Sequence, residues 1–175
     1  MLLTEAYREE QKILHSRGNY GTASLQYGQI VRDIINKSGA LTVLDYGCGS
    51  KQSLRKVLCP AHDVLYRGYD PAVDEYAVEP KASDLVVCID VLEHIEPECL
   101  DDVLDHLKSL SPKLAFLTVH TGPAGKVLSD GRNAHLIQQP SSWWLPKIIE
   151  RWDLERFQKT KRGFSVLCQS LPIQN

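Results

Sequence analysis

The segment Val43-Leu44-Asp45-Tyr46-Gly47-Cys48-Gly49 decides the fold of this 175-residue chain. It is a short apolar stretch that runs into a turn with two glycines, and a helix-prone segment at about residues 50–58 follows. Glycine lets the backbone approach a ligand closely, and the start of a helix offers unpaired N–H groups to that ligand. Gln52 stands where the dinucleotide-binding fingerprint has its third glycine, which disfavours a nicotinamide-dependent enzyme.

The rest of the chain alternates apolar stretches with helix-like segments. We expect strands at residues 41–44, 64–69, 85–89 and 114–119, and helices at residues 22–37, 98–110 and from 141 or 142 to about 152. Residues 154–160 and 164–168 have the pattern of a closing hairpin. This order predicts an α/β fold with a mostly parallel sheet, helices on both faces and an antiparallel C-terminal hairpin strand.

Length and composition fit a single domain over residues 1–175. Within it, we expect residues 1–37 to form a helical cap or lid and residues 121–142 to form a loop on the substrate side.

A net charge of -2 disfavours broad binding to nucleic acid or an anionic membrane. No apolar stretch approaches the ~18 residues of a membrane span, so we expect no membrane partner. The five cysteines are scattered, which is typical of reduced thiols in a cytoplasmic protein.

Two further motifs follow the glycine turn. Asp70 ends the next strand about 20 residues later, where an acid can accept hydrogen bonds from both hydroxyls of a ribose. The run D-L-V-V-C-x-D-V-L-E-H-I then occupies residues 84–95. With these three motifs the chain resembles the class I S-adenosylmethionine-dependent methyltransferases over roughly residues 20–120. The resemblance implies a Rossmann-like fold and S-adenosylmethionine as the cofactor.

The resemblance also assigns roles to individual residues. The glycine turn would face the methionine end and the sugar of the cofactor, Asp70 would hold the ribose, and Ile89-Asp90 would border the methyl sulfonium. The aromatic-glycine pair Tyr20-Gly21 would close over the cofactor. The expected cofactor site is therefore Tyr20, Gly21, Asp45, Gly47, Cys48, Gly49, Asp70, Ile89 and Asp90.

One departure from the family concerns the adenine. Only 13 residues separate Asp70 from Asp84. The usual helix, third strand and adenine-contacting acid must therefore be shortened or missing, and Asp84 is a poor replacement because it starts a buried strand.

The acceptor side carries no motif of the DNA methyltransferases. Asp90-Val91-Leu92-Glu93 replaces the Pro-Pro-aromatic motif of the amino-methylating enzymes, and the Pro-Cys nucleophile of the cytosine enzymes is absent. We therefore predict methyl transfer to a hydroxyl or amine of a small molecule, such as a metabolite, sugar or nucleotide. Positioning does much of the work in such a displacement. His135 or His120 is the best candidate for a general base, although each could equally be a structural residue.

A metal site is the alternative interpretation of the same region. Asp90, Glu93 and His94 have the spacing of one helical turn, and His120 or His135 would complete a set of ligands suited to Mg²⁺, Mn²⁺ or a related ion. The pattern is similar to those of metal-dependent O-methyltransferases of small-RNA 3′ ends and of ubiquinone synthesis, although Leu-Glu-His also occurs in relatives without a metal. His135 lies before Trp143, as a later histidine lies before a tryptophan in the RNA enzymes of this kind, and is the favoured fourth ligand. The alternative functions are thus a divalent-metal-dependent RNA 2′-O-methyltransferase and an inactive cofactor-binding subunit.

Overall fold

A six-stranded mixed sheet forms the centre of the computed structural model, which describes residues 1–16, 22–58 and 63–171. The strands are β1 (Thr42–Tyr46), β2 (Leu65–Tyr69), β3 (Leu85–Ile89), β4 (Leu114–His120), β5 (Trp152–Lys159) and β6 (Gly163–Ser170). Their order across the sheet is β2-β1-β3-β4-β6-β5. β2, β1, β3 and β4 run parallel, whereas β6 is antiparallel to both β4 and β5. The predicted fold class is confirmed.

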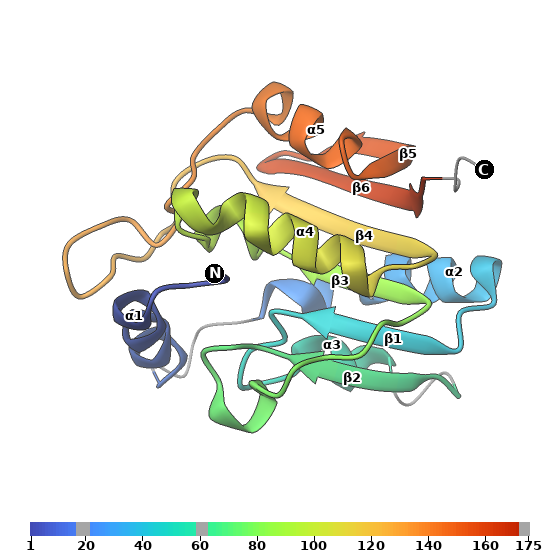
Figure 1. Cartoon of the computed structure of the whole chain (residues 1–175), viewed down its shortest axis with the longest axis horizontal. Coiled ribbons are helices and arrows are strands. Elements are labelled where there is room, and N and C mark those ends of the chain that lie inside the picture. Colours follow the sequence, from blue (N-terminus) through green and yellow to red (C-terminus); the bar gives the residue numbers. More distant parts are fainter. Residues whose placement is uncertain (17–21, 59–62, 172–175) are drawn as a thin grey trace.

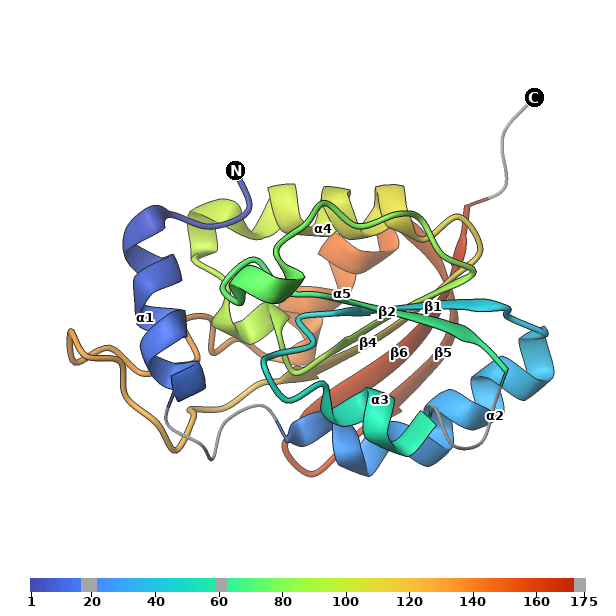
Figure 2. The same cartoon turned by 90° about the horizontal axis from the view of Figure 1, so that it is seen from below.

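Helices cover both faces of the sheet (Figures 1 and 2). On one face lie α4 (Leu100–Leu110) and α5 (Ser141–Ile149), and on the other α2 (Gly28–Ser38) and α3 (Ser53–Leu58). Each face has its own apolar cluster, and every residue of β3 is buried between the two, as expected for a central parallel strand. No helix in the described ranges is long and apolar enough to cross a lipid bilayer.

A third, smaller apolar cluster lies beyond the carboxyl ends of the parallel strands. It joins helix α1 (Glu5–Ser16) to the loop after β4, and its buried members are Tyr7, Leu14, Leu128 and Ala134. Figures 1 and 2 show α1 and this loop side by side at that end of the molecule. We call α1 together with residues 121–140 the cap.

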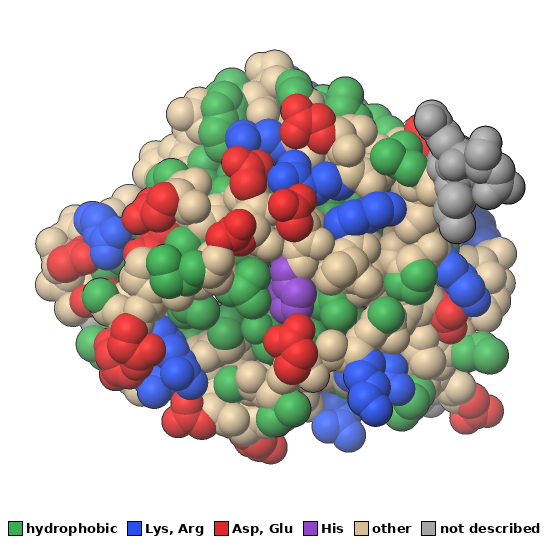
Figure 3. All heavy atoms as spheres, viewed as in Figure 1, with side chains coloured by type: hydrophobic (Ala, Val, Ile, Leu, Met, Phe, Trp, Pro, Cys, Tyr) green, Lys and Arg blue, Asp and Glu red, His purple; other side chains and the backbone are tan. Residues whose placement is uncertain are grey.

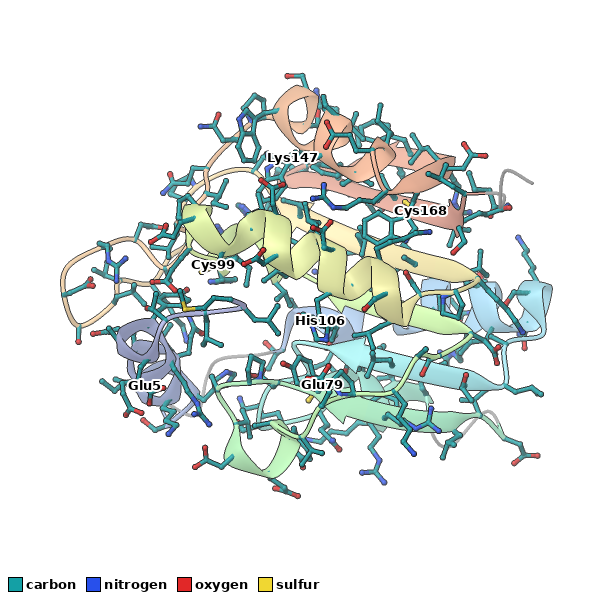
Figure 4. All side chains as sticks on the ribbon, viewed as in Figure 1. Glu5, Glu79, Cys99, His106, Lys147 and Cys168 are labelled. Carbon is teal, nitrogen blue, oxygen red and sulfur yellow. The ribbon has the colours of Figure 1, made fainter. Side chains whose placement is uncertain are left out.

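The segment between β2 and β3 is abbreviated, as the sequence predicted. Residues 71–84 contain no strand and only a short 3₁₀ turn, η2 (Asp74–Tyr76), so β2 is an edge strand. The segment crosses the α4 side of β1 and β2 (Figure 2). His106 of α4 joins it to the sheet: one ring nitrogen is 3.0 Å from the Tyr46 hydroxyl and the other is 3.0 Å from Glu79 (Figure 4).

Two predicted helix boundaries were wrong. The helix expected at residues 22–37 begins as a 3₁₀ turn, η1 (Ala23–Tyr27), before α2 continues to Ser38. The helix expected to reach Trp152 ends at Ile149, and Trp152 is the first residue of β5. The Trp152 side chain is buried in the core and its indole N–H donates to the Ser111 hydroxyl at 2.9 Å, so this tertiary contact outweighs the local helical pattern.

Candidate active site

A cavity of about 370 Å³ lies at the carboxyl ends of the parallel strands and beneath α1. Open α/β sheets bind ligands at this end, and the volume is within the usual range of small-molecule sites. The structure brings together all described members of the predicted cofactor site, because the cavity is lined by Asp45, Gly47, Cys48, Gly49, Asp70, Ile89 and Asp90. Tyr20 and Gly21 lie outside the described residues.

The turn after β1 requires its glycines. Gly47 has a φ of +78° and Gly49 a φ of +61°, values that other residues adopt at a cost. A Cβ atom on Gly47 would lie 2.4 Å from Cγ2 of Val91. The Gly47 N–H donates to the carbonyl oxygen of Tyr69 at 2.8 Å, which ties the turn to the end of β2.

Two buried acids stand on either side of this turn. The Tyr66 hydroxyl donates to Oδ2 of Asp45 at 2.5 Å. Burial raises the pKa of Asp45 to about 7, although this hydroxyl opposes the shift. Asp70 accepts hydrogen bonds from the backbone N–H groups of Gly49 and Ala72, each at 3.0 Å. Burial raises the pKa of Asp70 too, and the nearby His15 and the two N–H groups act in the opposite direction.

Asp90 occupies a tight turn directly after β3. Its φ is +51°, an uncommon conformation for a residue other than glycine. Its N–H donates to Thr118 of β4, and the Thr118 hydroxyl donates back to Oδ1 of Asp90 at 2.6 Å. The Asp90 carboxylate is therefore held at the end of β3, at the edge of the cavity.

Three histidines line the opposite side of the cavity. The ring centroids of His94 and His135 are 4.6 Å apart, and those of His120 and His135 are 4.8 Å apart. Nδ1 of His94 lies 2.7 Å from the Ala134 carbonyl oxygen, and Nδ1 of His135 lies 2.7 Å from that of Gly122. Because a carbonyl oxygen only accepts, both rings carry a proton on Nδ1 and present the lone pair of Nε2.

Burial keeps these two imidazoles neutral. It lowers the pKa of His94 to about 3, with further lowering by His135, and it lowers the pKa of His135 as well. Neutral rings with a fixed tautomer can accept a proton or bind a metal ion through Nε2.

Glu93 lies beside the histidines in the 3₁₀ turn η3 (Leu92–His94). Its Oε1 accepts the backbone N–H of His120 at 2.9 Å, whereas its buried Oε2 has no partner in the described part of the chain. Burial raises the pKa of this carboxyl well above its usual range, and the charge of Asp90 adds to the effect. Potential ligand atoms of Glu93, His94 and His135 lie within 4.8 Å of one another.

Asp90 is not a member of this group of ligand atoms. The helical turn expected to place it beside Glu93 and His94 does not form, because Asp90 has a left-handed backbone and the 3₁₀ turn begins only at Leu92. The structure thus assembles three of the four residues predicted to bind a metal.

Sequence reasoning missed the residue that shapes the loop carrying His135. The side-chain oxygen of Asn133 accepts the N–H groups of Ala124 and His135, both at 2.9 Å, and its amide donates to the Ala124 carbonyl oxygen at 2.9 Å. Asn133 follows Gly131, which has a φ of +89°. An asparagine near a glycine is a common turn signal and was the available clue.

Sequence reasoning also named no residue of α1. Tyr7, Gln11 and His15 of this helix line the cavity. The Tyr7 hydroxyl donates to the His94 carbonyl oxygen, and the Gln11 side-chain amide donates to that hydroxyl at 2.5 Å. These contacts place α1 against the histidine side of the cavity.

Comparison with solved structures finds the same fold in several methyltransferases. A 1,6-didemethyltoxoflavin-N1-methyltransferase from Burkholderia thailandensis, with its substrate and S-adenosylhomocysteine bound, matches with a TM-score of 0.67 and 13% identity, over 95% of this chain and 89% of that one. An O-methyltransferase family protein from the same organism matches with a TM-score of 0.62 and 16% identity, over 89% of this chain. This chain covers 59% of that protein's length.

The methyltransferase domain of bacterial CtHen1 is a third similar structure. Its TM-score is 0.61 and its identity 16%, over 84% of this chain and 97% of that one. By sequence, no protein-family model and no curated protein matches the chain. The structural matches establish that the chain has the fold of the class I methyltransferases.

Proposed function

We propose that the protein transfers the methyl group of S-adenosylmethionine to a hydroxyl or amine of a small molecule. The observation that carries this proposal is one cavity with two chemically different sides. The glycine turn, Asp45 near the end of β1 and Asp70 after β2 would form the donor side, and the three histidines would form the acceptor side. The toxoflavin methyltransferase supports the choice of donor, since its structure contains S-adenosylhomocysteine.

On the donor side, the roles follow from position. Asp70 would accept the ribose hydroxyls, because its two oxygens are already oriented by backbone N–H groups. Asp45 and the glycine turn would face the methionine part and the sugar, with Cys48 in the wall of the turn. Ile89 and Asp90 would border the sulfonium, where a carboxylate complements the positive charge.

On the acceptor side, His135 and His120 are the proposed general bases. The Nε2 lone pair of His135 is available to take the proton that the acceptor loses, because Nδ1–H is held by Gly122. Methyl transfer is a direct displacement, so the larger contribution is to hold the acceptor in line with the methyl group.

Calorimetry with S-adenosylmethionine tests the donor assignment. We expect the wild type to bind it and Asp70→Ala to bind it at least tenfold more weakly, since two buried hydrogen bonds to a charged group are lost. Asp84→Asn is the matched control: Asp84 also accepts backbone N–H groups at a strand end, but at the opposite end of the sheet. Absence of binding to the wild type would refute the proposal, and equal loss in both variants would refute the role of Asp70.

A divalent metal ion is a second candidate component, favoured by the unpartnered Oε2 of Glu93. One potential ligand atom each of Glu93, His94 and His135 lies within 4.8 Å of the others, and each ring is oriented by a backbone carbonyl oxygen, as is common for metal-binding histidines. Two imidazoles and one carboxylate fit Mn²⁺ better than Mg²⁺, which prefers oxygen ligands, and Asp90 lies outside the set. A bound ion would lower the pKa of an acceptor hydroxyl.

Titration with Mn²⁺ tests this candidate directly. We expect Glu93→Gln and His135→Ala to reduce Mn²⁺ affinity at least tenfold, while S-adenosylmethionine affinity changes less than twofold. Wild-type protein that shows no Mn²⁺ binding at millimolar concentration would eliminate the metal.

The face of the molecule shown in Figure 3 supports a small acceptor over RNA. On the face shown in Figure 3, basic and acidic side chains are interspersed and no broad basic region appears. In the C-terminal third, Lys147 and Arg151 pair with Asp101 and Asp105 of α4. RNA is the alternative acceptor because the residues Glu93, His94 and His135 resemble the pattern of the metal-dependent RNA 2′-O-methyltransferases. Preferential methylation of RNA over small hydroxyl compounds would reverse the choice of a small acceptor. A subunit that binds the donor and methylates neither class would be the inactive alternative.

A further inference from the structure

His15 lines the cavity beside Asp70, and the proposed function gives it no role. It lies in the last turn of α1, its side chain is only 11% exposed, and it lines the cavity together with Asp70 and Gly49. Its position above the glycine turn is close: a Cβ atom on Gly49 would lie 3.3 Å from the ring carbon Cε1 of His15. The imidazole therefore faces the proposed sugar end of the donor pocket.

The spacing between His15 and Asp70 suits a hydroxyl group. Nε2 of His15 is 3.7 Å from Oδ2 of Asp70, which is too long for a hydrogen bond between them. A hydroxyl placed against both atoms could donate its proton to the carboxylate and accept N–H from the imidazole, each at an ordinary length of about 2.7–3.0 Å. Asp70 cannot adjust its position easily, because Gly49 and Ala72 hold both of its oxygens.

The position of His15 is set by α1 rather than by a ligand. The helix is held to three separate segments, through Arg8 to Asp74 at 3.2 Å, the Tyr7 hydroxyl to the His94 carbonyl oxygen, and Glu10 to the N–H of Ser129 at 2.8 Å. Residues 71–84 supply no α-helix or strand beside Asp70. On this side the last turn of α1 is thus the element that faces Asp70 across the cavity.

We propose that His15 is a second contact for the sugar of the methyl donor, binding the same ribose hydroxyl as Asp70. The inference rests on the proposed function, since it takes S-adenosylmethionine as the ligand. It extends that function by assigning donor recognition to the N-terminal helix. The probe is S-adenosylhomocysteine, which carries the same ribose and does not react.

Calorimetry on full-length variants tests the contact. We expect His15→Leu to weaken S-adenosylhomocysteine binding about tenfold and His15→Gln to recover most of it, because a glutamine amide can also donate to the hydroxyl. In combination with Asp70→Asn, His15→Leu should cost less than threefold more, because the two residues bind one group.

His106→Gln is the matched control. His106 is similarly buried, at 13% exposed, and also faces a carboxylate, that of Glu79, but it does not line the cavity. Figure 4 shows His106 and Glu79 together beneath α4, apart from Glu5 on α1. We expect this variant to bind S-adenosylhomocysteine like the wild type.

The outcomes separate the two proposals. Wild type that does not bind S-adenosylhomocysteine overturns the proposed function and this inference with it. Wild type that binds, with His15→Leu unchanged, overturns only the role of His15. Two further results also overturn the inference: equal loss of S-adenosylhomocysteine affinity in His15→Leu and His15→Gln, or fully additive losses for His15→Leu and Asp70→Asn. Either would show that the His15 side chain acts only through packing.

Discussion

Gly47 is required for two reasons, its backbone conformation and the lack of space for a Cβ atom, and experiment can separate them. Its φ of +78° favours glycine, and a Cβ atom would also meet Val91 at 2.4 Å. Gly39, the C-cap of α2, has a φ of +67° and nothing within 4 Å of the added atom. The two positions therefore differ in the contact and not in the backbone.

We predict that Gly47→Ala is more destabilising than Gly39→Ala. Gly39→Ala should lower the free energy of unfolding by about 1 kcal/mol from backbone strain alone. Gly47→Ala should lower it by roughly 2 kcal/mol more, because the added Cβ also meets Val91. Urea unfolding measures both, and Val91→Ala should recover part of the loss at Gly47. Equal losses at the two glycines would contradict the contact.

The predicted cofactor-site residues that line the cavity have a common property. Asp45 lies near the carboxyl end of β1, Gly47 directly follows β1 and Asp70 directly follows β2, so the strand pattern alone places them at the ligand-binding end of the sheet. Asp90 was placed on the correct strand but in the wrong local structure. A 3₁₀ turn and a left-handed residue leave little trace in composition, so its separation from the Glu93 group could not be predicted.

At the scale of elements, the sequence pattern predicts a helix in this part of the chain, whereas the contacts that α1 makes could not be predicted. Tyr7 bonds to a residue 87 positions away, and Glu10 to one 119 positions away. No local pattern encodes such partners. At Trp152 the local pattern was misleading. The pattern predicted a helix, whereas the residue lies in a strand and its indole bonds to Ser111, which is distant in sequence. The alternation of buried and polar residues was sufficient for the sheet and insufficient for the cap.

Tyr7→Phe tests how α1 is held. The variant keeps the ring in the cap cluster and loses the bond to the His94 carbonyl oxygen, at a cost of about 1 kcal/mol to docking of the helix. We expect faster amide hydrogen exchange in residues 5–16 and in the loop after β4, with little change in the rest of the sheet. Unchanged exchange in both segments would show that this hydroxyl is dispensable.

At the scale of the whole molecule, the two ends of the sheet have different tasks. The carboxyl ends of the parallel strands carry the cavity, whereas Asp84 joins strands at the other end. Its carboxylate accepts the N–H groups of Leu41 and Thr42 and pairs with Lys113 at 2.6 Å. The Lys113 ammonium is the main cause that lowers the pKa of Asp84 to about 2, and the backbone N–H groups contribute.

This pKa predicts a dependence of stability on pH. Because the pKa is lower in the folded protein than the ~3.9 of an unfolded aspartate, the carboxylate stabilises the fold above about pH 4. The contribution is lost as the pH falls from about 4 to about 2. The free energy of unfolding of wild type should exceed that of Asp84→Asn by about 1–2 kcal/mol at pH 7 and approach it near pH 2, as measured by urea unfolding. A constant difference over this range would refute the assignment.

The long-range contacts of α1 also bear on how the protein is made. During synthesis α1 leaves the ribosome well before Glu96 and Ser129, the residues to which Thr4 and Glu10 bond. The helix must therefore wait undocked while the central strands are produced and paired. In the order of assembly, α1 therefore docks only after the later segments that it contacts have been made, and the walls of the cavity come together at that late step.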